Sequence, residues 1–273
     1  MKQPLKIGII GGGNMGQAML EGFLKQGIAP QYLMVADHKN EHCQQVTKLF
    51  EVFATTDNAK LAESVDVLIL AIKPQQMPIV VREMASCITH QLIVSVAAGV
   101  GTDQIKAWLG NENTAIIRAM PNTPAVIGEG ATALFANASV TQSQKDAVQE
   151  LMQSLGSVLW VNKESQMHVV TALSGSGPAY FFYMLENLIT AGEALGLSTS
   201  QAEQLTLQTA LGSIQMALKS DVDLQTLRRK VTSKGGTTER GIQILQEGHF
   251  AELILQAVQQ AAERSREISD TQQ

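Results

Sequence analysis

The chain has 273 residues, of which 45% are hydrophobic and 16% charged, and its formal net charge is −5. This composition supports a substantial core and excludes a disordered chain, and no uninterrupted apolar run approaches the roughly 18 residues of a membrane span. The negative charge gives no electrostatic basis for binding nucleic acid or an anionic membrane surface.

The first predicted elements are a strand at residues 5–10 and a helix at residues 17–26, joined by a glycine-rich turn. Gly11, Gly13 and Gly16 have the spacing G-x-G-x-x-G. In a dinucleotide-binding turn the first glycine permits the tight turn, the second admits a pyrophosphate to backbone N–H groups, and the third lets helix and strand pack closely. The positive end of the helix would face the phosphates. An ordinary strand-to-helix turn is the alternative.

The second predicted strand, residues 32–36, ends at Asp37, about twenty residues beyond the last glycine. A dinucleotide fold places there the acidic group that binds the adenosine ribose. A carboxylate accepts hydrogen bonds from a free 2′-hydroxyl and repels a 2′-phosphate, whereas His38 and Lys39 would attract that phosphate. The choice between NADH and NADPH therefore stays open. A helix N-cap or turn is the alternative role for Asp37.

Strands and helices continue to alternate to residue 161, which predicts a doubly wound parallel sheet. Further strands are predicted at residues 51–55, 66–72, 91–97, 115–119, 129–136 and 158–161. Further helices are predicted up to Ser64 with Asp57 or Asn58 as cap, at 76–87, at 102–109 with Thr102 as cap, and at 141–155. Ligands of such sheets lie beyond the carboxyl ends of the strands. We therefore expect residues 11–16, 73–74 and 97–99 to line one crevice.

Two side chains near this crevice are candidate cofactor contacts. Lys73 follows a strand end directly, although a solvated loop lysine is the alternative. Asn122 lies between Pro121 and Pro124, and the two prolines predict a rigid, extended loop. Such a loop would hold a flat ring in place, and a turn at a domain edge is the alternative.

From Glu164 onward the pattern predicts helices alone, at residues 164–173, 179–195, 198–219, 223–231, 239–246 and 250–268. Residues 174–178 and 232–238 form two loops rich in Gly, Ser and Thr that each open a helix. Backbone N–H groups and hydroxyls in such loops bind carboxylates, and a helix cap is the alternative for each. The helix at 179–195 is apolar on nearly every face, which indicates burial against another subunit.

Six segments together resemble the motifs of the pyrroline-5-carboxylate reductase family: residues 10–15, 71–74, 95–99, 120–124, 173–180 and 231–238. The resemblance implies an α/β Rossmann-type domain at residues 1–162, followed by an all-α domain at residues 163–273 for dimerisation and substrate binding. It implies reduction of 1-pyrroline-5-carboxylate to L-proline by hydride transfer from NADPH or NADH, the last step of proline biosynthesis. The implied partner is a second copy, in an interlocked homodimer or a higher oligomer such as a decamer.

The resemblance also implies residue roles. The cofactor contacts would be Gly11, Gly13, Asn14, Met15, Asp37, Asn58, Ala71, Ile72, Lys73, Ala97, Ala98 and Glu164. The substrate contacts would be Ser233, Gly236, Thr237 and Thr238, with the Thr238 hydroxyl near the ring nitrogen as the catalytic group. The loops described above add Asn122 as a cofactor contact, and Ser176 and Gly235 as substrate contacts. Asp37 and Lys230 depart from residues found in some members, and both departures bear on the cofactor contacts.

Two other functions stay open. A β-hydroxyacid dehydrogenase needs a base, typically a lysine on the helix after the Gly-Ser-Gly loop. Residues 178–197 contain no Lys, Arg or His, which argues against this function. A non-catalytic dinucleotide-binding sensor would explain the glycine turn and the helices, and would leave residues 232–238 without a purpose.

The remaining sequence features predict a plain intracellular protein. Cys43 and Cys87 have no metal or redox spacing and are expected to be free thiols in a reducing compartment. The five histidines are scattered, so we expect surface or core roles for them and no metal site. Residues 1–4 lead directly into the first strand, so we expect no signal peptide and a cytoplasmic location.

Overall fold

The structure is a computed structural model that describes residues 5–270. The chain divides into two compact units, one of residues 1–176 with 259–273 and one of residues 177–258. This division falls later than the predicted domain boundary after residue 162, because the segment 163–176 packs with the first unit. The functional division at residue 162 stays a prediction.

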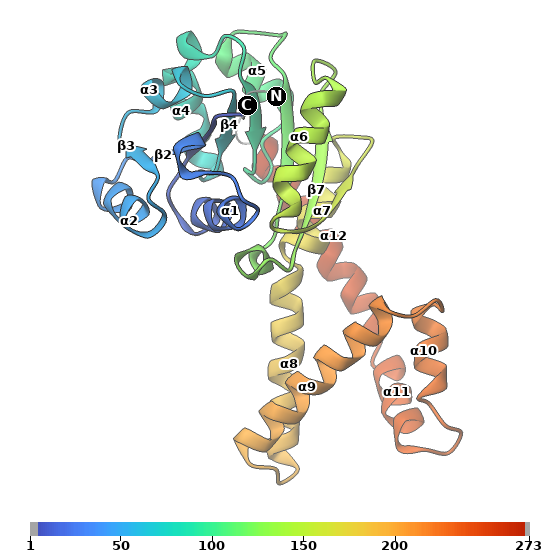
Figure 1. Ribbon diagram of the computed structural model, residues 1–273. Helices are drawn as coiled ribbons and strands as arrows, with labels where there is room; N and C mark the ends of the chain where they lie inside the picture. The colour runs from blue at the N-terminus through green and yellow to red at the C-terminus, as the bar shows by residue number, and fades with distance from the viewer. Residues whose placement is uncertain (1–4, 271–273) are drawn as a thin grey trace. The chain divides into compact units, whose positions relative to one another are not determined.

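An eight-stranded sheet forms the centre of the first unit (Figure 1). Its spatial order is β3-β2-β1-β4-β5-β6-β7-β8. The strands are β1 (Ile7–Ile10), β2 (Leu33–Ala36), β3 (Phe53–Thr55), β4 (Val67–Leu70), β5 (Leu92–Ser95), β6 (Ile116–Met120), β7 (Gly130–Ala136) and β8 (Gly156–Trp160). The order reverses between β1 and β4, which makes the crevice beyond their carboxyl ends the expected ligand site.

The first six strands are parallel, as predicted, but β7 runs antiparallel to β6, and β8 is parallel to β7. The prediction of a wholly parallel sheet is therefore wrong for the last two strands. A parallel connection needs a crossover of about a dozen residues or more, usually a helix. Residues 121–129 are too short for that, and they contain only a 3₁₀ helix at Thr123–Ile127.

Helices cover both faces of this sheet, as expected for a doubly wound fold. One buried core joins Ile7 and Ile9 of β1 to α1 (Asn14–Lys25), α2 (Asn40–Phe50) and α6 (Gln142–Gln153). The opposite core joins Ile10 to α3 (Asn58–Glu63), α4 (Met77–Glu83) and α5 (Thr102–Leu109). Short 3₁₀ helices lie at Pro30–Tyr32, Pro74–Gln76 and Ala85–Cys87.

The Gly-Ser-Gly segment is helical, so the predicted loop at residues 174–178 is wrong. Helix α7 (Gln166–Val170) runs into a π-helical turn at Thr171–Gly175, and α8 (Gly177–Ala194) follows. The N–H of Ser176 donates to the carbonyl of Thr171 at 2.8 Å. Pro178 lies in the first turn of α8, where its missing N–H leaves no helical bond unmade.

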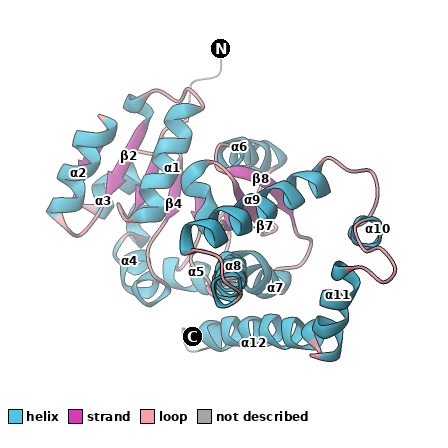
Figure 2. Ribbon diagram, turned by 90° about the horizontal axis from the view of Figure 1, so that it is seen from below, coloured by secondary structure: helices cyan, strands magenta, loops and turns pink. Residues whose placement is uncertain are grey.

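The second unit contains only helices and loops (Figure 2). Its helices are α8, α9 (Thr199–Leu218), α10 (Leu224–Lys230), α11 (Thr237–Glu247) and the first part of α12 (Phe250–Asp270). Ser198 caps α9 and Asp223 caps α10 through their side-chain oxygens. Of residues 177–258 only Gly177 and Ala202 are buried. A single copy therefore leaves the apolar faces of these helices in solvent.

Candidate functional site

The glycine turn lies at the carboxyl ends of β1, β2 and β4. The N–H of Gly11 donates to Ala36 O at 2.7 Å, and the N–H of Ala71 donates to Ile10 O at 2.8 Å. Gly11 has a φ of +111°, and a side chain there would collide with the carbonyl of Ala71. A side chain at Gly16 would collide with the carbonyl of Gly11. Both glycines therefore have the steric roles predicted from their spacing.

The N-terminus of α1 presents free backbone donors beside this turn. The helix begins at Asn14, three residues earlier than predicted, and its first backbone bond runs from Gln17 N to Gly13 O at 2.9 Å. The N–H groups of Asn14, Met15 and Gly16 precede that bond and have no partner within the helix. A Cβ added at Gly13 would meet no atom within 4 Å. This open cradle of N–H groups fits a pyrophosphate.

Asp37 fixes the glycine turn from the end of β2. Its side chain is 7% exposed; Oδ2 accepts the N–H of Gly12 at 2.8 Å, and Oδ1 accepts the N–H of Lys39 at 2.9 Å. Burial raises the pKa of this carboxyl, but the backbone hydrogen bonds from Lys39 and Gly12 and the neighbouring His42 ring outweigh burial and leave the pKa below its ordinary value. Asp37 is therefore a carboxylate at neutral pH, and Lys39 rather than Asp37 precedes α2 as its N-cap.

Two histidines converge on this carboxylate, which the sequence analysis missed. His42 Nδ1 lies 3.1 Å from Asp37 Oδ2, and His38 Nδ1 lies 3.3 Å from Oδ1. The prediction that the histidines are scattered is wrong for this pair. Helix α2 was also missed, although its apolar residues Cys43, Val46 and Phe50 lie at helical spacing. The i, i+4 spacing of the two histidines was the signal that could have found the pair.

The other predicted cofactor segments lie along the same edge of the sheet. Ile10 pairs with Leu70 of β4, and Leu70 pairs with Ser95 of β5, so these strand ends are neighbours. The segments that follow are Ala71, Ile72 and Lys73 after β4, and Ala97 and Ala98 after β5. These segments therefore follow neighbouring strand ends at the same end of the sheet as the glycine turn, and their lining of one crevice stays a prediction.

Asn58 begins α3, and Asp57 is the cap of that helix. The N–H of Lys60 donates to Asp57 Oδ1 at 3.0 Å. This geometry decides between the two cap candidates in favour of Asp57. It leaves the half-buried Asn58 in the first turn of a helix that packs beside β2.

Glu164 binds the N-terminus of α5. Its Oε1 accepts the N–H of Thr102 at 2.7 Å, and its Oε2 accepts the Thr102 hydroxyl at 2.8 Å. Arg118, which is buried in β6, donates from Nη1 to Oε1 at 3.1 Å. Gly101 is the N-cap of α5, so the predicted cap role of Thr102 is wrong. Glu164 holds in place the helix that follows the Ala97–Ala98 segment.

Both the oxygen and the nitrogen of the Asn122 side-chain amide make hydrogen bonds. Its Oδ1 accepts the N–H of Ala131 at 2.9 Å, and its Nδ2 donates to the carbonyl and the hydroxyl of Ser174, each at 3.3 Å. The segment after it is a 3₁₀ helix, so the predicted extended loop is wrong. In this structure Asn122 ties β7 to the π-helical turn.

The loop at residues 232–238 is shorter than predicted, because α11 begins at Thr237. The N–H of Gly235 donates to Glu239 Oε2 at 2.7 Å, and the N–H of Gly236 donates to Ser233 O at 3.0 Å. The first helical bond runs from Arg240 N to Gly236 O at 3.3 Å. Three N–H groups precede it: those of Thr237, Thr238 and Glu239.

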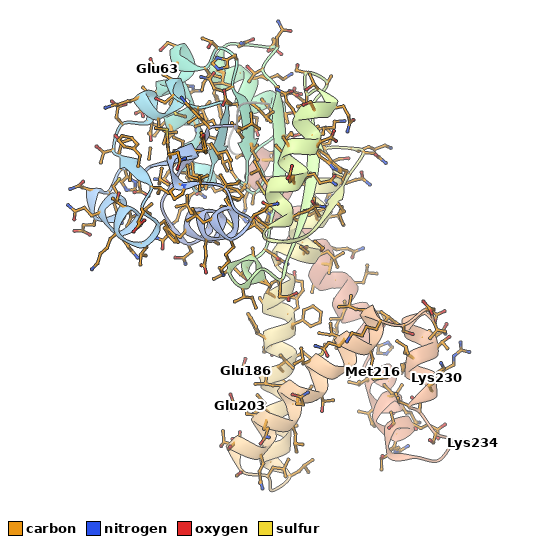
Figure 3. All side chains as sticks on the ribbon, in the orientation of Figure 1. Glu63, Glu186, Glu203, Met216, Lys230 and Lys234 are labelled. Atoms are coloured by element: carbon orange, nitrogen blue, oxygen red, sulfur yellow. The ribbon has the colours of Figure 1, made fainter. Side chains whose placement is uncertain are left out.

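This helix start is therefore a candidate anion site of the second unit, to which the N–H groups of Thr237 and Thr238 would contribute. The amides of Gly235 and Gly236 are already engaged by the loop itself. Lys230 and Lys234 extend from α10 and from the loop, close to this helix start in the sequence (Figure 3). Ser176, the remaining substrate candidate, is half-buried in the first unit.

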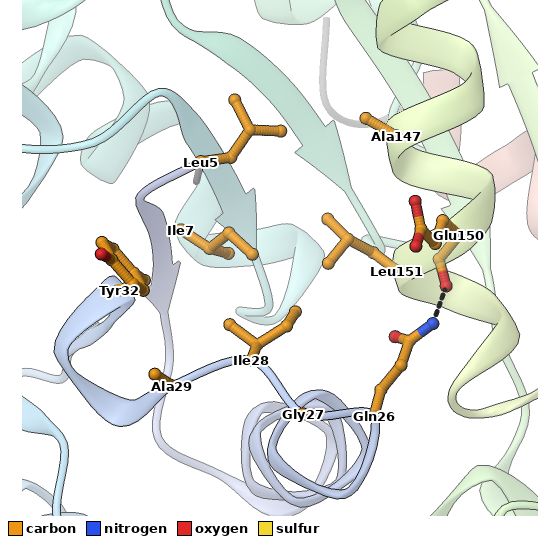
Figure 4. Close-up of a pocket in the computed structure, with 10 residues that line it drawn as sticks. All are labelled: Leu5, Ile7, Gln26, Gly27, Ile28, Ala29, Tyr32, Ala147, Glu150 and Leu151. Carbon is orange, nitrogen blue, oxygen red and sulfur yellow. Dashed lines mark hydrogen bonds between the residues drawn. The ribbon is translucent and has the colours of Figure 1, made fainter. Parts of the chain in front are cut away.

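A cavity of about 370 Å³ lies elsewhere in the first unit (Figure 4). Its lining includes Leu5 and Ile7 at the start of β1, and Gln26 beside it donates to Glu150 O at 2.9 Å. It is thus at the amino ends of the strands, away from the glycine turn. In residues 5–270, no cluster of three or more His, Cys, Asp or Glu could hold a metal ion, and no helix is long and apolar enough to cross a membrane.

The open α1 N-terminus at the reversal of strand order defines a dinucleotide-binding protein of the Rossmann type. Two family comparisons agree with this class. Residues 6–99 match the family described as "NADP oxidoreductase coenzyme F420-dependent". Residues 164–268 match the family described as "Pyrroline-5-carboxylate reductase dimerisation".

Relatives extend the similarity over nearly the whole chain. A pyrroline-5-carboxylate reductase of Pseudomonas aeruginosa is 41% identical over 97% of this chain and 97% of its own. The solved structure of a pyrroline-5-carboxylate reductase from Coxiella burnetii has a TM-score of 0.92 and 40% identity, covering 98% of this chain and 99% of that one. A pyrroline carboxylate reductase structure from Plasmodium falciparum, with NADP bound, has a TM-score of 0.88 and 30% identity, covering 97% and 98%. The chain belongs to the pyrroline-5-carboxylate reductase family.

Proposed function

We propose that the chain reduces 1-pyrroline-5-carboxylate to L-proline with NADPH or NADH, the last step of proline biosynthesis. The observation that carries this proposal is the open cradle at the N-terminus of α1, placed at the strand-order reversal in a chain of this family. A β-hydroxyacid dehydrogenase is disfavoured because α8 contains no lysine, arginine or histidine.

The cofactor would lie along the carboxyl edge of the sheet. The N–H groups of Asn14 and Met15 would hold the pyrophosphate, and Asp37 would lie near the adenosine ribose with Asn58. Residues 71–73 and 97–98 would line the remainder of the cofactor, as their positions beyond β4 and β5 favour. Bound NAD(P)H supplies a hydride to the imine carbon of the substrate. Glu164 and Asn122 would act here by holding α5 and β7 in place.

The substrate carboxylate would bind at the start of α11. The N–H groups of Thr237 and Thr238 are unpaired within the helix and lie at its positive end, which favours an anion. The Thr238 hydroxyl would orient the ring nitrogen. The neutral imine first takes up a proton, and the protonated cyclic imine is already a good hydride acceptor. Transfer of one hydride to its carbon then gives proline. The protein must mainly position the two reactants and exclude water.

The functional assembly is proposed to be a homodimer or a higher oligomer such as a decamer, in the cytoplasm. Support for self-association comes from the second unit, where Phe181, Phe182 and Tyr183 of α8 are 59%, 66% and 69% exposed. Large apolar side chains that are exposed in this number favour burial against a partner.

Steady-state oxidation of NADH and NADPH with 1-pyrroline-5-carboxylate as acceptor tests the function. We expect turnover that depends on the imine, and the ratio of the two kcat/KM values gives the cofactor preference. Folded, oligomeric protein that binds a nicotinamide cofactor and shows no imine-dependent oxidation would contradict the reductase and favour a dinucleotide sensor.

A further inference from the structure

We propose that His38 and His42 make the cofactor preference depend on pH. Protonation of these rings beside Asp37 would convert the ribose site from one that favours a free 2′-hydroxyl to one that also accepts a 2′-phosphate. The inference rests on the proposed function in one respect, namely that the turn at residues 11–16 binds NAD(P).

The acceptor capacity of Asp37 is largely used by the protein itself. Each carboxylate oxygen already accepts one backbone N–H, Oδ2 from Gly12 and Oδ1 from Lys39. The side chain is 7% exposed, so it holds the glycine turn in place and has little surface left for a ribose. Its negative charge still opposes a 2′-phosphate, and that charge is what neighbouring cations would offset.

The two imidazoles face Asp37 through the same ring nitrogen. Nδ1 of His42 and Nδ1 of His38 lie 3.1 Å and 3.3 Å from the carboxylate oxygens. A neutral ring keeps its proton on Nδ1 in this position, which leaves Nε2 as an acceptor. A second proton on Nε2 turns it into a donor and gives each ring a positive charge, which suits a phosphate. Nδ1 of His42 is buried without a well-aligned hydrogen bond among the described residues, and Asp37 Oδ2 is the charged group that it faces.

The other titratable groups around this carboxylate are Cys43 of α2, whose thiol donates to Asp37 O at 3.4 Å, and the charged side chains of the neighbouring elements. Glu41 and Lys48 lie on α2 itself, and Lys39 precedes it. The strands packed against α2, β2 and β3, carry no charged residue. On α1 the charged residues are Glu21 and Lys25, which pair with each other at 2.7 Å. On α3 they are Lys60 and Glu63, with the cap Asp57 before them.

The test is calorimetric titration of the full-length protein with NADP⁺ and with NAD⁺ at pH values from about 8.0 to about 6.5. We expect the affinity ratio of NADP⁺ to NAD⁺ to rise about tenfold over this range, because the imidazoles gain positive charge beside the phosphate. The 2′-phosphate itself loses charge only near pH 6, so its own titration opposes the rise and contributes little. The kcat/KM ratio of NADPH to NADH should follow the same profile.

Three variants isolate the histidines. In the double variant His38→Gln, His42→Gln the affinity ratio should change by less than about twofold over the same range. His38→Arg should give a permanently high ratio that varies less with pH, which also guards against misfolding of the double variant. His90→Gln is the matched control, because His90 is exposed and lies just before β5, at the amino ends of the strands and not at their carboxyl ends. The pH profile of the affinity ratio in this variant should equal that of the unaltered protein.

Two outcomes would overturn the inference, and they are distinguishable. In the first outcome both cofactors bind, but the affinity ratio has the same pH profile in the unaltered protein and in the double variant. This result would disprove the role of the histidines and leave the proposed function intact. Absence of binding by either cofactor at every pH removes the proposed function as well.

Discussion

At the scale of single residues, Thr238 is the side chain on which the proposed chemistry depends most. Thr238→Ala should lower kcat/KM for the imine roughly 10- to 100-fold, because a hydrogen bond to a charged group is lost. Thr238→Ser keeps the hydroxyl and should retain most of the activity. Affinity for NADP⁺ should be unchanged in both variants. Undiminished kcat/KM in the alanine variant would show that the hydroxyl does not orient the imine nitrogen.

Glu164 is expected to stabilise the folded protein by pairing with Arg118. Glu164→Ala leaves the guanidinium of Arg118 buried without its counter-charge and should lower the free energy of unfolding by about 3 kcal/mol. The matched control is Asp103→Ala, which breaks an ion pair within α5 itself. Asp103 is 89% exposed and pairs with Lys106 of the same helix. Loss of an exposed pair should change the free energy of unfolding by less than about 1 kcal/mol. Equal effects in urea unfolding would contradict this account of Glu164.

The lowered pKa of His168 should make the free energy of unfolding depend on pH. Burial and then the charges of Arg118 and Arg266 lower its pKa below the ordinary value of 6.5. The folded state therefore favours the neutral ring, and the ring's contribution to stability is present above pH 6.5 and lost as the pH falls through the folded pKa.

Urea midpoints should accordingly fall more steeply in the unaltered protein than in His168→Gln when the pH drops from about 7.5 to 5.5. His249→Gln serves as the control, since that side chain is 77% exposed and should leave the slope unaltered. A slope that His168→Gln does not reduce would assign the acid sensitivity to other groups.

At the scale of elements, two glycines of the turn between β1 and α1 are expected to have different roles, Gly16 in folding and Gly13 in cofactor binding. Gly16→Ala should destabilise the fold strongly, because its Cβ would collide with the carbonyl of Gly11. Gly13→Ala should leave the melting temperature nearly unchanged, since no atom lies within 4 Å of its Cβ position and its φ of −76° suits alanine. The added methyl group would instead fill the phosphate cradle and raise the Kd for NADP⁺ at least about tenfold.

Thermal melts and cofactor titrations of the two glycine variants check this separation. A Gly13→Ala protein that melts normally and binds NADP⁺ as tightly as the parent would show that the pyrophosphate lies elsewhere.

The strands of the first unit were predictable because their apolar runs are buried on both faces, as in β4, where all of Val67–Leu70 is buried. Helix α2 was missed although Cys43, Val46 and Phe50 have helical spacing, because polar residues outnumber apolar ones along it. The reversed direction of β7 was not predictable either, because strand direction depends on whether a connection crosses over the sheet. The π-helical turn at Thr171–Gly175 was hidden by glycine, serine and proline, which usually end helices.

The candidate site was predictable where glycine spacing or strand ends define it. The convergence of His38 and His42 on Asp37 was not, since it needs the position of a helix that the sequence analysis missed. The bonds of Glu164 to Thr102 and Arg118 join residues far apart in the sequence, and no local pattern encodes them. The engaged amides of Gly235 and Gly236 likewise depend on Glu239, which the loop motif does not include.

At the scale of the whole molecule, the two units bury apolar surface in different ways. The first unit has two continuous cores, one on each face of its sheet. The second has only Gly177 and Ala202 buried, while several apolar side chains of α8 and α9 are more than half-exposed. Met216 of α9, labelled in Figure 3, is 58% exposed. An isolated unit of this kind would lack the buried area that stability requires.

A second copy of the chain is therefore expected to complete the core of the helical unit. Leu211→Glu would place a charge on an exposed apolar face of α9, where Leu211 is 51% exposed. Burying that carboxylate between two copies is strongly unfavourable, so the dissociation constant of the dimer should rise at least about a hundredfold. The matched control is Leu49→Glu on α2 of the first unit, a leucine that is 57% exposed.

Sedimentation velocity over a range of protein concentrations measures the outcome, and circular dichroism reports the helical content of each variant. Leu49→Glu should sediment as the parent does. Leu211→Glu should shift to monomer and lose helical signal, because its helical unit has no core of its own. If Leu211→Glu keeps the parent's mass and helicity at every concentration, the face of α9 that carries Leu211 is open to solvent in the assembly. The second copy would then have to bury a different apolar face of these helices.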